Sequence, residues 1–197
     1  MDTLAVAFTL FLIIDPLGNI PIFMSVLTPV ERARRKAILL RELFISLALM
    51  LGFLWAGPFV LKALDLSPEA VAISGGLILM IIAIRMIFPS RGGIMGDEEA
   101  PGEPLIVPLA TPLIAGPSIL ATLVLLSETS PERNVDWTLA LLGAWFVSAV
   151  ILLMSEKLFL ILGTRGLKAI ERLMGMILIS IAVQMLLNAF QGISFMN

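Results

Sequence analysis

The sequence contains no cysteine, no histidine and no tyrosine. These absences exclude disulfides, thiolate nucleophiles, Cys/His metal sites and Ser-His or Cys-His catalytic pairs. An aspartyl dyad would need a second aspartate in the middle of the membrane, and the sequence offers none. We therefore expect neither an enzyme nor a bound cofactor.

Charged residues are also scarce, at 14% of the 197 residues, whereas 59% are hydrophobic and the mean hydropathy is +1.04. A soluble domain is about 25% charged and about 45–50% apolar. Most of the chain is therefore expected to face lipid or other membrane helices. No basic tract suited to nucleic acid is present.

Six stretches are apolar over the about 20 residues that a membrane-spanning helix needs. All should be helices, because isolated strands cannot satisfy their backbone in lipid and no alternating barrel pattern occurs. The expected spans are residues 3–28, 37–61, 69–88, 105–127, 136–162 and 170–193. The sequence thus predicts an all-α membrane protein with six transmembrane helices.

Most basic residues fall on one side of this topology. Of the 13 lysines and arginines, 11 lie on one side, and only Lys62 and Arg133 lie on the other. Because cytoplasmic loops are enriched in lysine and arginine, we predict that both termini lie outside the cytoplasm. No basic segment precedes the first span, so we expect it to be retained and not cleaved as a signal peptide.

Two pairs of related sequences indicate an internal repeat. DPLGNIPIF at residues 15–23 resembles TPLIAGPSI at 111–119, and both carry a second proline five residues after the first. GLILMIIAIRM at 76–86 aligns with GMILISIAVQM at 175–185. The two offsets, 96 and 99 residues, are nearly equal.

The repeat divides the chain into three-helix units at residues 1–90 and 105–197, joined by an acidic cytoplasmic linker at 91–104. Each unit crosses the membrane three times, so the second unit begins on the opposite side of the membrane from the first. The second unit must therefore be inverted relative to the first. Inverted repeats with broken helices are typical of secondary transporters, whose substrate site lies where the breaks meet. Gly75 and Gly76 are expected to allow close packing of helices.

We expect the first and fourth helices to break at their proline pairs, Pro16 with Pro21 and Pro112 with Pro117. Proline lacks an amide hydrogen and displaces the preceding residue from helical geometry. The Leu-Gly-Asn segment between the first two prolines should therefore lose helical hydrogen bonds. The second proline of each pair suits the first turn of a half-helix, whose N-terminus attracts an anion. Simple kinks are the alternative.

A substrate with both a carboxylate and an ammonium group would fit such breaks. The carboxylate would meet the half-helix N-termini, and the ammonium group or a coupling cation would meet Asp15, since intramembrane acids are functional by default. Gly18 and Gly116 would let the backbone approach closely. Alternatively, Asp15 is only a helix cap. Gln184 and Asn188 in the last span either support the site or hold helices together.

The chain resembles the MarC family of bacterial and archaeal membrane proteins over essentially its whole length. The resemblance rests on DPLGNIPIF in the first span, TPLIAGP in the fourth and GLILMIIAIRMI in the third. It implies a carrier of small neutral amino acids, coupled to protons or sodium ions, in the prokaryotic plasma (inner) membrane. It also implies a relation to amino-acid exporters of the LysE type. The residues it places near the substrate are Asp15, Gly18, Asn19, Thr111, Gly116 and Ser118.

These observations together predict a secondary transporter that works by alternating access. The rival interpretations are an exporter of another metabolite or of a drug, a channel, and a non-transporting membrane protein of envelope homeostasis. So small a bundle exposes much surface, which is compatible with a homo-oligomer.

Overall fold

The computed structural model describes residues 2–27, 30–88 and 114–194, and every regular element in these ranges is helical. The predicted all-α class is therefore confirmed. In chain order the elements are α1 Thr3–Ile14, α2 Pro16–Leu27, α3 Arg32–Ala63, α4 Pro68–Ile87, α6 Pro117–Thr129, the 3-10 helix η2 Pro131–Arg133, α7 Asn134–Leu153 and α8 Ser155–Ser194.

Five of the described segments are long and apolar enough to cross a membrane. They are Thr3–Ile20, Arg34–Ala63, Pro68–Ile87, Pro131–Leu153 and Arg165–Gly192. Helix α6 is apolar too, but its 13 residues extend about 20 Å, less than the about 30 Å of a bilayer core. The expected fourth span begins outside the described residues. The described residues therefore contain five candidate spans and one shorter apolar helix, whereas the sequence predicted six spans.

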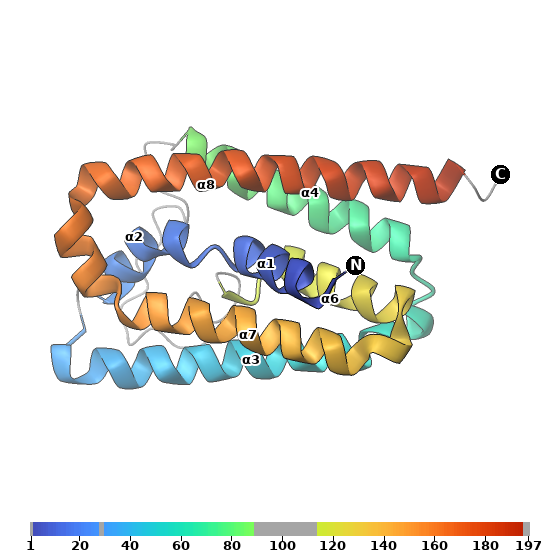
Figure 1. Cartoon of the computed structure of the whole chain (residues 1–197), viewed down its shortest axis with the longest axis horizontal. Coiled ribbons are helices and arrows are strands. Elements are labelled where there is room, and N and C mark those ends of the chain that lie inside the picture. Colours follow the sequence, from blue (N-terminus) through green and yellow to red (C-terminus); the bar gives the residue numbers. More distant parts are fainter. Residues whose placement is uncertain (1, 28–29, 89–113, 195–197) are drawn as a thin grey trace.

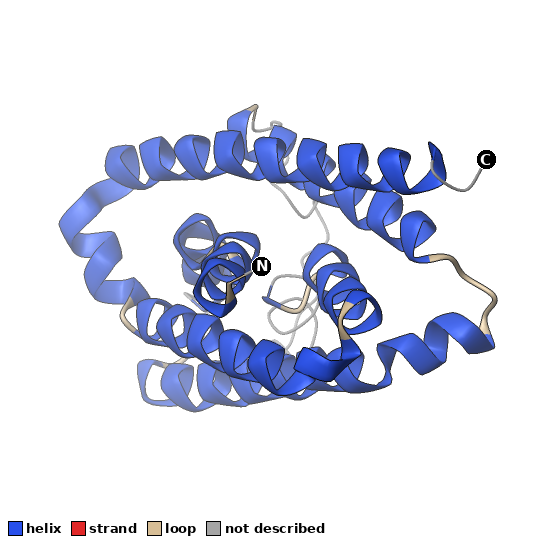
Figure 2. Cartoon of the chain, turned by 45° about the vertical axis from the view of Figure 1, so that its right-hand side comes forward, coloured by secondary structure: helices blue, strands red, loops and turns tan. Residues whose placement is uncertain are grey.

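The helices form two outer layers with shorter helices between them (Figures 1 and 2). Helices α4 and α8 pack along each other in one layer, and α3 and α7 form the other. Between these layers α1 packs against α7, α2 against α8, and α6 against both α3 and α4. The short helices next to the proline motifs therefore lie inside the bundle.

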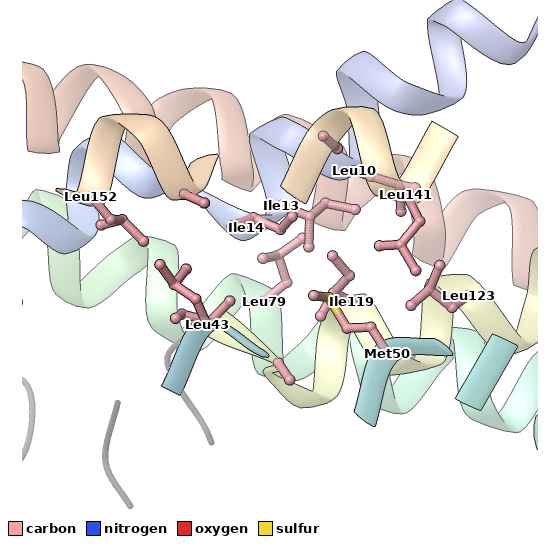
Figure 3. Packing of buried hydrophobic residues seen from close by; sticks show 14 of the residues in the cluster. Leu10, Ile13, Ile14, Leu43, Met50, Leu79, Ile119, Leu123, Leu141 and Leu152 are labelled. Carbon is pink, nitrogen blue, oxygen red and sulfur yellow. The ribbon is translucent and has the colours of Figure 1, made fainter. Parts of the chain in front are cut away.

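Large apolar side chains fill the space between the layers (Figure 3). Leu10 and Ile14 of α1, Leu43 of α3 and Leu79 of α4 are fully buried in one cluster. Because lipid tails are as apolar as leucine, close packing of these side chains holds the helices together in a bilayer. Other large apolar side chains, such as Phe59, point outward, as expected for helices that face lipid.

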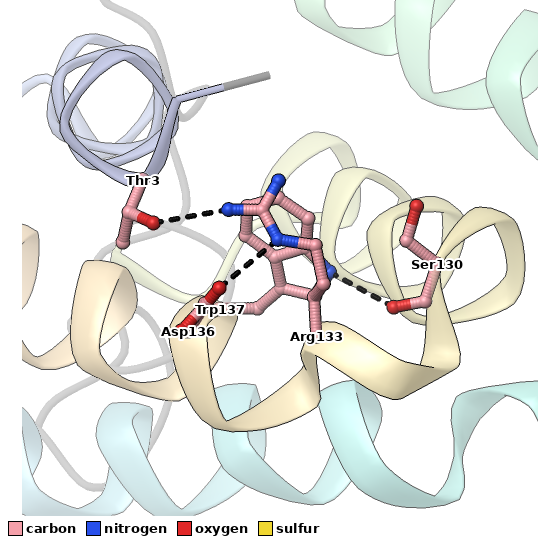
Figure 4. Close-up of polar contacts among 5 residues, drawn as sticks. All are labelled: Thr3, Ser130, Arg133, Asp136 and Trp137. Atoms are coloured by element: carbon pink, nitrogen blue, oxygen red, sulfur yellow. Dashed lines mark hydrogen bonds and ion pairs between the residues drawn. The ribbon is translucent and has the colours of Figure 1, made fainter.

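A polar cluster joins the start of α1 to the start of α7 (Figure 4). The Arg133 guanidinium donates to Asp136 Oδ2 at 3.0 Å and to Thr3 Oγ1 at 3.2 Å, and it lies 4.4 Å from the ring centroid of Trp137. The Trp137 indole in turn donates to the carbonyl oxygen of Ser130 at 3.3 Å. These contacts fix the short helix α1 against α7 at this end of the bundle.

Basic residues gather at the other end, where α3 begins, α4 ends and α8 begins. We call this the basic end. It carries Arg34, Arg35, Lys36, Arg85, Lys157, Arg165, Lys168 and Arg172. Lys62 and Arg133 lie near the opposite end, where α3 ends and α7 begins. The charge asymmetry in the sequence is thus an asymmetry between the two ends of the bundle.

The last two helices differ from expectation. The predicted fifth span was to reach residue 162, but α7 ends at Leu153 and α8 begins at Ser155. Gly163 interrupts α8 with φ 62° and ψ 177°, a conformation that glycine adopts most readily. Residues 155–162 therefore bend away from the long straight part of α8, as the left side of Figure 1 shows. Their apolar side chains made the segment look like a continuation of the span.

Candidate functional site

The break in the first span lies at a single residue. Helix α1 ends at Ile14, α2 begins at Pro16, and Asp15 between them has φ 46° and ψ 59°, in the left-handed region. Asp15 is buried, with 5% of its surface exposed. Aspartate tolerates this conformation better than most residues because its short side chain can bond the nearby backbone. The structure therefore places a carboxylate inside the bundle, where the helix changes direction.

Two side chains satisfy backbone groups on both sides of the break. Asp15 Oδ1 accepts a hydrogen bond from the Gly18 amide at 3.1 Å, which caps the N-terminus of α2. Asn19 Nδ2 donates to the carbonyl oxygen of Ile14 at 2.9 Å, at the end of α1. Asp15, Gly18 and Asn19, which the sequence placed together, therefore form one structural unit.

The expected unwinding between the two prolines is wrong. Helix α2 runs without interruption from Pro16 to Leu27, so Leu17, Gly18 and Asn19 are helical and Pro21 lies within the helix. The cap explains the difference, because Pro16 suits the first helical position and Asp15 satisfies the Gly18 amide. The helix can therefore start five residues before the second proline.

Gly18 allows the Asp15 carboxylate to sit against α2. A Cβ added at residue 18 would overlap Asp15 Oδ2 and would lie 2.8 Å from Asp15 Cγ and 2.5 Å from Met86 Cε. The Met86 side chain is flexible at its far end, but the carboxylate is held by the cap. The space beside Gly18 is thus already occupied by the acidic group.

Replacing Gly18 with alanine should displace this carboxylate. We expect Gly18→Ala to destabilise the protein by about 1–3 kcal/mol, the usual cost of overpacking, measured as a lower midpoint of thermal unfolding in detergent. Gly52→Ala is the matched control, because a Cβ there meets nothing within 4 Å. Equal midpoints for the two variants would contradict the contact between Gly18 and Asp15.

The second proline motif is described only in part. Thr111 and Pro112 lie outside the described residues, whereas Gly116 is the N-cap of α6 and Pro117 its first residue. No side chain in the described ranges caps this helix, so its first-turn amides face the end of the helix without a side-chain acceptor. Ser118 is buried beside α4, where its Cα lies 3.8 Å from a Cβ built on Gly75.

The candidate residues do not all meet at one point. Gly18 approaches α4 at Met86, and Ser118 approaches the same helix at Gly75, eleven residues earlier. The two breaks therefore border one helix at different levels. Gln184 and Asn188 are exposed on α8, where Gln184 Nε2 donates to Asn188 Oδ1 at 2.7 Å.

Two charged features at the basic end were not predicted as parts of a site. Glu42 of α3 is one of them, and it is 0% exposed. A cavity of about 60 Å³ lies between α2, α3 and the junction of α7 with α8. At its edge Arg35 Nη1 and Glu156 Oε1 form an ion pair of 2.5 Å. Within the described residues, no group of three or more acidic side chains is placed to hold a metal ion.

Comparison with known proteins decides the family. The model of the MarC family of integral membrane proteins matches residues 2–194. The chain belongs to the MarC family. The UPF0056 inner membrane protein YhgN of Escherichia coli (strain K12) is 52% identical over 190 residues, which cover 96% of each chain. No solved structure matches the chain.

More distant MarC-family relatives also align along most of their length. A UPF0056 membrane protein of Buchnera aphidicola subsp. Baizongia pistaciae is 48% identical, with 97% of each chain covered. The UPF0056 membrane protein MJ1677 of Methanocaldococcus jannaschii is 31% identical, with 93% of each chain covered. The resemblance predicted from the motifs is therefore confirmed, and by this relationship the chain is a multi-pass inner-membrane protein.

Proposed function

We propose that this MarC-family protein is a secondary transporter of small neutral amino acids such as glycine and alanine, driven by a cation gradient. Transport would proceed by alternating access between two inverted three-helix repeats, with both termini outside the cytoplasm. Support comes from the family membership, the break at Asp15 and the packing of α4 on α8.

The packing of α4 on α8 is the observation that carries the proposal. The two helices are antiparallel, as the colours of Figure 1 show. On α4, Gly76 brings the backbones close: a Cβ added there would lie 3.2 Å from the carbonyl oxygen of Ala182 and 3.3 Å from Leu186 Cγ, both on α8.

Helix α8 makes the same contacts in return. A Cβ added at Gly175 would lie 3.0 Å from the carbonyl oxygen of Ala83 and 2.9 Å from Ile87 Cγ1, both on α4. The two sets of contacts correspond at an offset of 99 positions. Gly76 corresponds to Gly175, Ala83 to Ala182, and Ile87 to Leu186. We call these six residues the glycine seam.

Reciprocal contacts between antiparallel helices are what an inverted repeat predicts. Two equivalent helices that exchange the same contacts are related by a two-fold axis perpendicular to both. For helices that cross a membrane, this axis lies in the membrane plane, as in transporters built from inverted repeats. Alternating access then requires only that one repeat rocks against the other around a central site.

The residues at the breaks suit an amino-acid zwitterion. The ammonium group, or a coupling cation, would bind at Asp15, whose carboxylate is held inside the bundle by the cap on α2. The carboxylate would bind at the first turn of α6, where helix amides and the helix dipole favour an anion. Both breaks border α4, eleven residues apart, so the carrier would have to bring them closer together to hold both charged groups of one small amino acid.

Counterflow in proteoliposomes tests the proposal. Vesicles loaded with unlabelled alanine should take up external labelled glycine or alanine faster than unloaded vesicles, with saturation at high substrate concentration. Saturation and counterflow together would exclude a simple pore. Failure of every small neutral amino acid to exchange, in protein that is well folded by thermal unfolding, would reject the substrate class.

A further inference from the structure

The cavity at the basic end has an apolar side and a polar side. It lies between α2, α3 and the junction of α7 with α8, and its volume is about 60 Å³. The residues of its apolar side are Met24, Leu27, Leu39 and Leu153. Because a single water molecule needs only about 10–15 Å³ of such a volume, the cavity has room for a larger group.

The polar side of the cavity carries a net positive charge. Arg35 and Lys36 contribute two positive charges and Glu156 one negative charge, which leaves a net charge of +1. Arg35 is held in place, because its Nε donates to the carbonyl oxygen of Val30 at 2.9 Å and its Nη1 pairs with Glu156 Oε1. The Lys36 ammonium group has no hydrogen-bond or ion-pair partner among the described residues. Lys36 therefore supplies the charge that a ligand would meet.

Ser155 adds a buried hydroxyl group to the polar side. Only 3% of this residue is exposed, and its hydroxyl makes no hydrogen bond within the described structure. Buried polar groups normally have a partner, because leaving one unpaired costs free energy. Ser155 is also the first residue of α8, so the positive end of the helix dipole lies at the cavity. An ammonium group, a hydroxyl donor and a helix N-terminus all favour an anion.

The depth of the cavity matches the headgroup layer of a bilayer. Arg41 and Lys62 are 21 residues apart on α3, or about 32 Å, which matches the about 30 Å of a hydrocarbon core. Leu39 and Arg35 precede Arg41 by two and six residues, and so lie about 3 Å and about 9 Å beyond that boundary. Since the headgroup layer is about 5–8 Å thick on each side, the cavity lies at the level of the lipid phosphates.

We propose that this cavity binds the phosphate group of an anionic phospholipid from the adjoining leaflet. The phosphate accepts hydrogen bonds from the Lys36 ammonium group and the Ser155 hydroxyl, and the first carbons of an acyl chain cover the apolar side at Leu27 and Leu39. Basic pockets between transmembrane helices bind anionic headgroups in this way. A free phosphate ion would meet the same polar groups but would leave the apolar side uncovered.

A lipid bound in this cavity joins three parts of the fold. Leu27 belongs to α2, the helix that begins at the Asp15 break, whereas Lys36 belongs to α3 and Ser155 to α8. A ligand that binds only the folded protein stabilises it. An anionic phospholipid should therefore raise the unfolding temperature. Lipid binding at this cavity does not require the transport function proposed above.

Thermal unfolding in mixed micelles tests the proposal. The full chain, delipidated in an uncharged detergent, is titrated at constant ionic strength with phosphatidylglycerol, phosphatidylcholine or inorganic phosphate. We expect phosphatidylglycerol to raise the unfolding midpoint in a saturable way, and to raise it more than phosphatidylcholine does. An equal rise with both lipids would reject a site for an anionic lipid. The same rise with inorganic phosphate would show that free phosphate, and not lipid, is the ligand.

Single variants locate the binding. Lys36→Gln should weaken the apparent affinity for phosphatidylglycerol at least about tenfold, the usual scale for a lost hydrogen bond to a charged group. Ser155→Ala should weaken it by about two- to tenfold. Lys157→Gln is the matched control, because Lys157 is exposed at the same end of the bundle but does not line the cavity. Equal weakening in Lys36→Gln and Lys157→Gln would mean that the lipid binds a general positive surface, which would overturn the proposal.

Native mass spectrometry detects the lipid without relying on stability. Wild-type protein released from micelles with equal amounts of both lipids should retain phosphatidylglycerol, and Lys36→Gln should lose it. Lys36→Arg keeps the positive charge and should retain the lipid, so it decides the question together with Ser155→Ala if Lys36→Gln folds poorly. Equal retention by wild type, Lys36→Gln and Ser155→Ala would reject the cavity. Because these measurements involve no transport, they leave the test of the carrier by counterflow independent.

Discussion

Asp15→Asn should lower amino-acid counterflow at least tenfold while leaving the fold intact. Asparagine can keep both structural features of this position, because it tolerates the left-handed conformation and is as good a helix cap as aspartate. What it loses is the charge that the proposed site offers to an ammonium group or cation. Hydrogen bonds to charged groups contribute about 1.5–3 kcal/mol, which corresponds to a factor of about ten or more in binding.

Asp15→Ala separates the cap from the charge. Alanine cannot accept from the Gly18 amide, a loss of about 1 kcal/mol, and the left-handed backbone costs it about 1–2 kcal/mol more. We therefore expect Asp15→Ala to lower both the thermal-unfolding midpoint and counterflow, whereas Asp15→Asn should lower counterflow and leave the midpoint unchanged.

Asp65→Asn is the matched control for both variants. Among the described residues other than glycine, Asp15 and Asp65 have positive φ. Asp65 has φ 52° and lies exposed just after the end of α3. Its replacement should change neither counterflow nor the unfolding midpoint. Full counterflow in Asp15→Asn would show that Asp15 only caps α2, and the substrate site would have to be sought elsewhere.

Larger residues in the glycine seam should destabilise the protein from either side. We expect Gly175→Leu and Gly76→Leu each to lower the unfolding midpoint, by an equivalent of about 1–3 kcal/mol or more, because α4 and α8 would be forced apart. The smaller change Gly175→Ala should cost more than Gly76→Ala, since its Cβ would be 2.9 Å from Ile87 Cγ1, against 3.2 Å for the nearest contact at Gly76.

Gly143→Leu serves as the control for the seam. Gly143 lies in the middle of α7, and a Cβ added there meets nothing within 4 Å. The unfolding midpoint should therefore stay near that of wild type, as read from tryptophan fluorescence in detergent. If Gly143→Leu lowered the unfolding midpoint as much as Gly175→Leu, leucine would be destabilising at any glycine of these helices. The close packing at the glycine seam would then not explain the effect.

The features that the sequence predicted well depend on local chemistry. Runs of apolar residues located the spans, because crossing lipid requires about 20 of them in succession. Pro16 and Asp15 indicated a helix break, and the break lies there. Close packing at Gly75 and Gly76 was also expected, and the structure places Ala121 of α6 and Ala182 of α8 against them.

The features that the sequence did not predict depend on tertiary packing. Pro21 carries the same local signal as Pro16, yet the cap at Asp15 lets the helix continue through it. The burial of Glu42 was not predicted, because a charged residue next to Arg41 near the end of an expected span is ordinarily found at the interface. The end of α7 at Leu153 was missed because the apolar run continues into the bent segment.

That bent segment has a consequence for how the bundle can move. Leu160 and Ile161, just before Gly163, are 82% and 79% exposed. In a bilayer they would sit among the acyl chains near the basic end, and lifting either into water would cost about 1.5–3 kcal/mol. Sliding α8 along the membrane normal toward the basic side is therefore opposed. The bend thus sets the depth of α8 in the membrane.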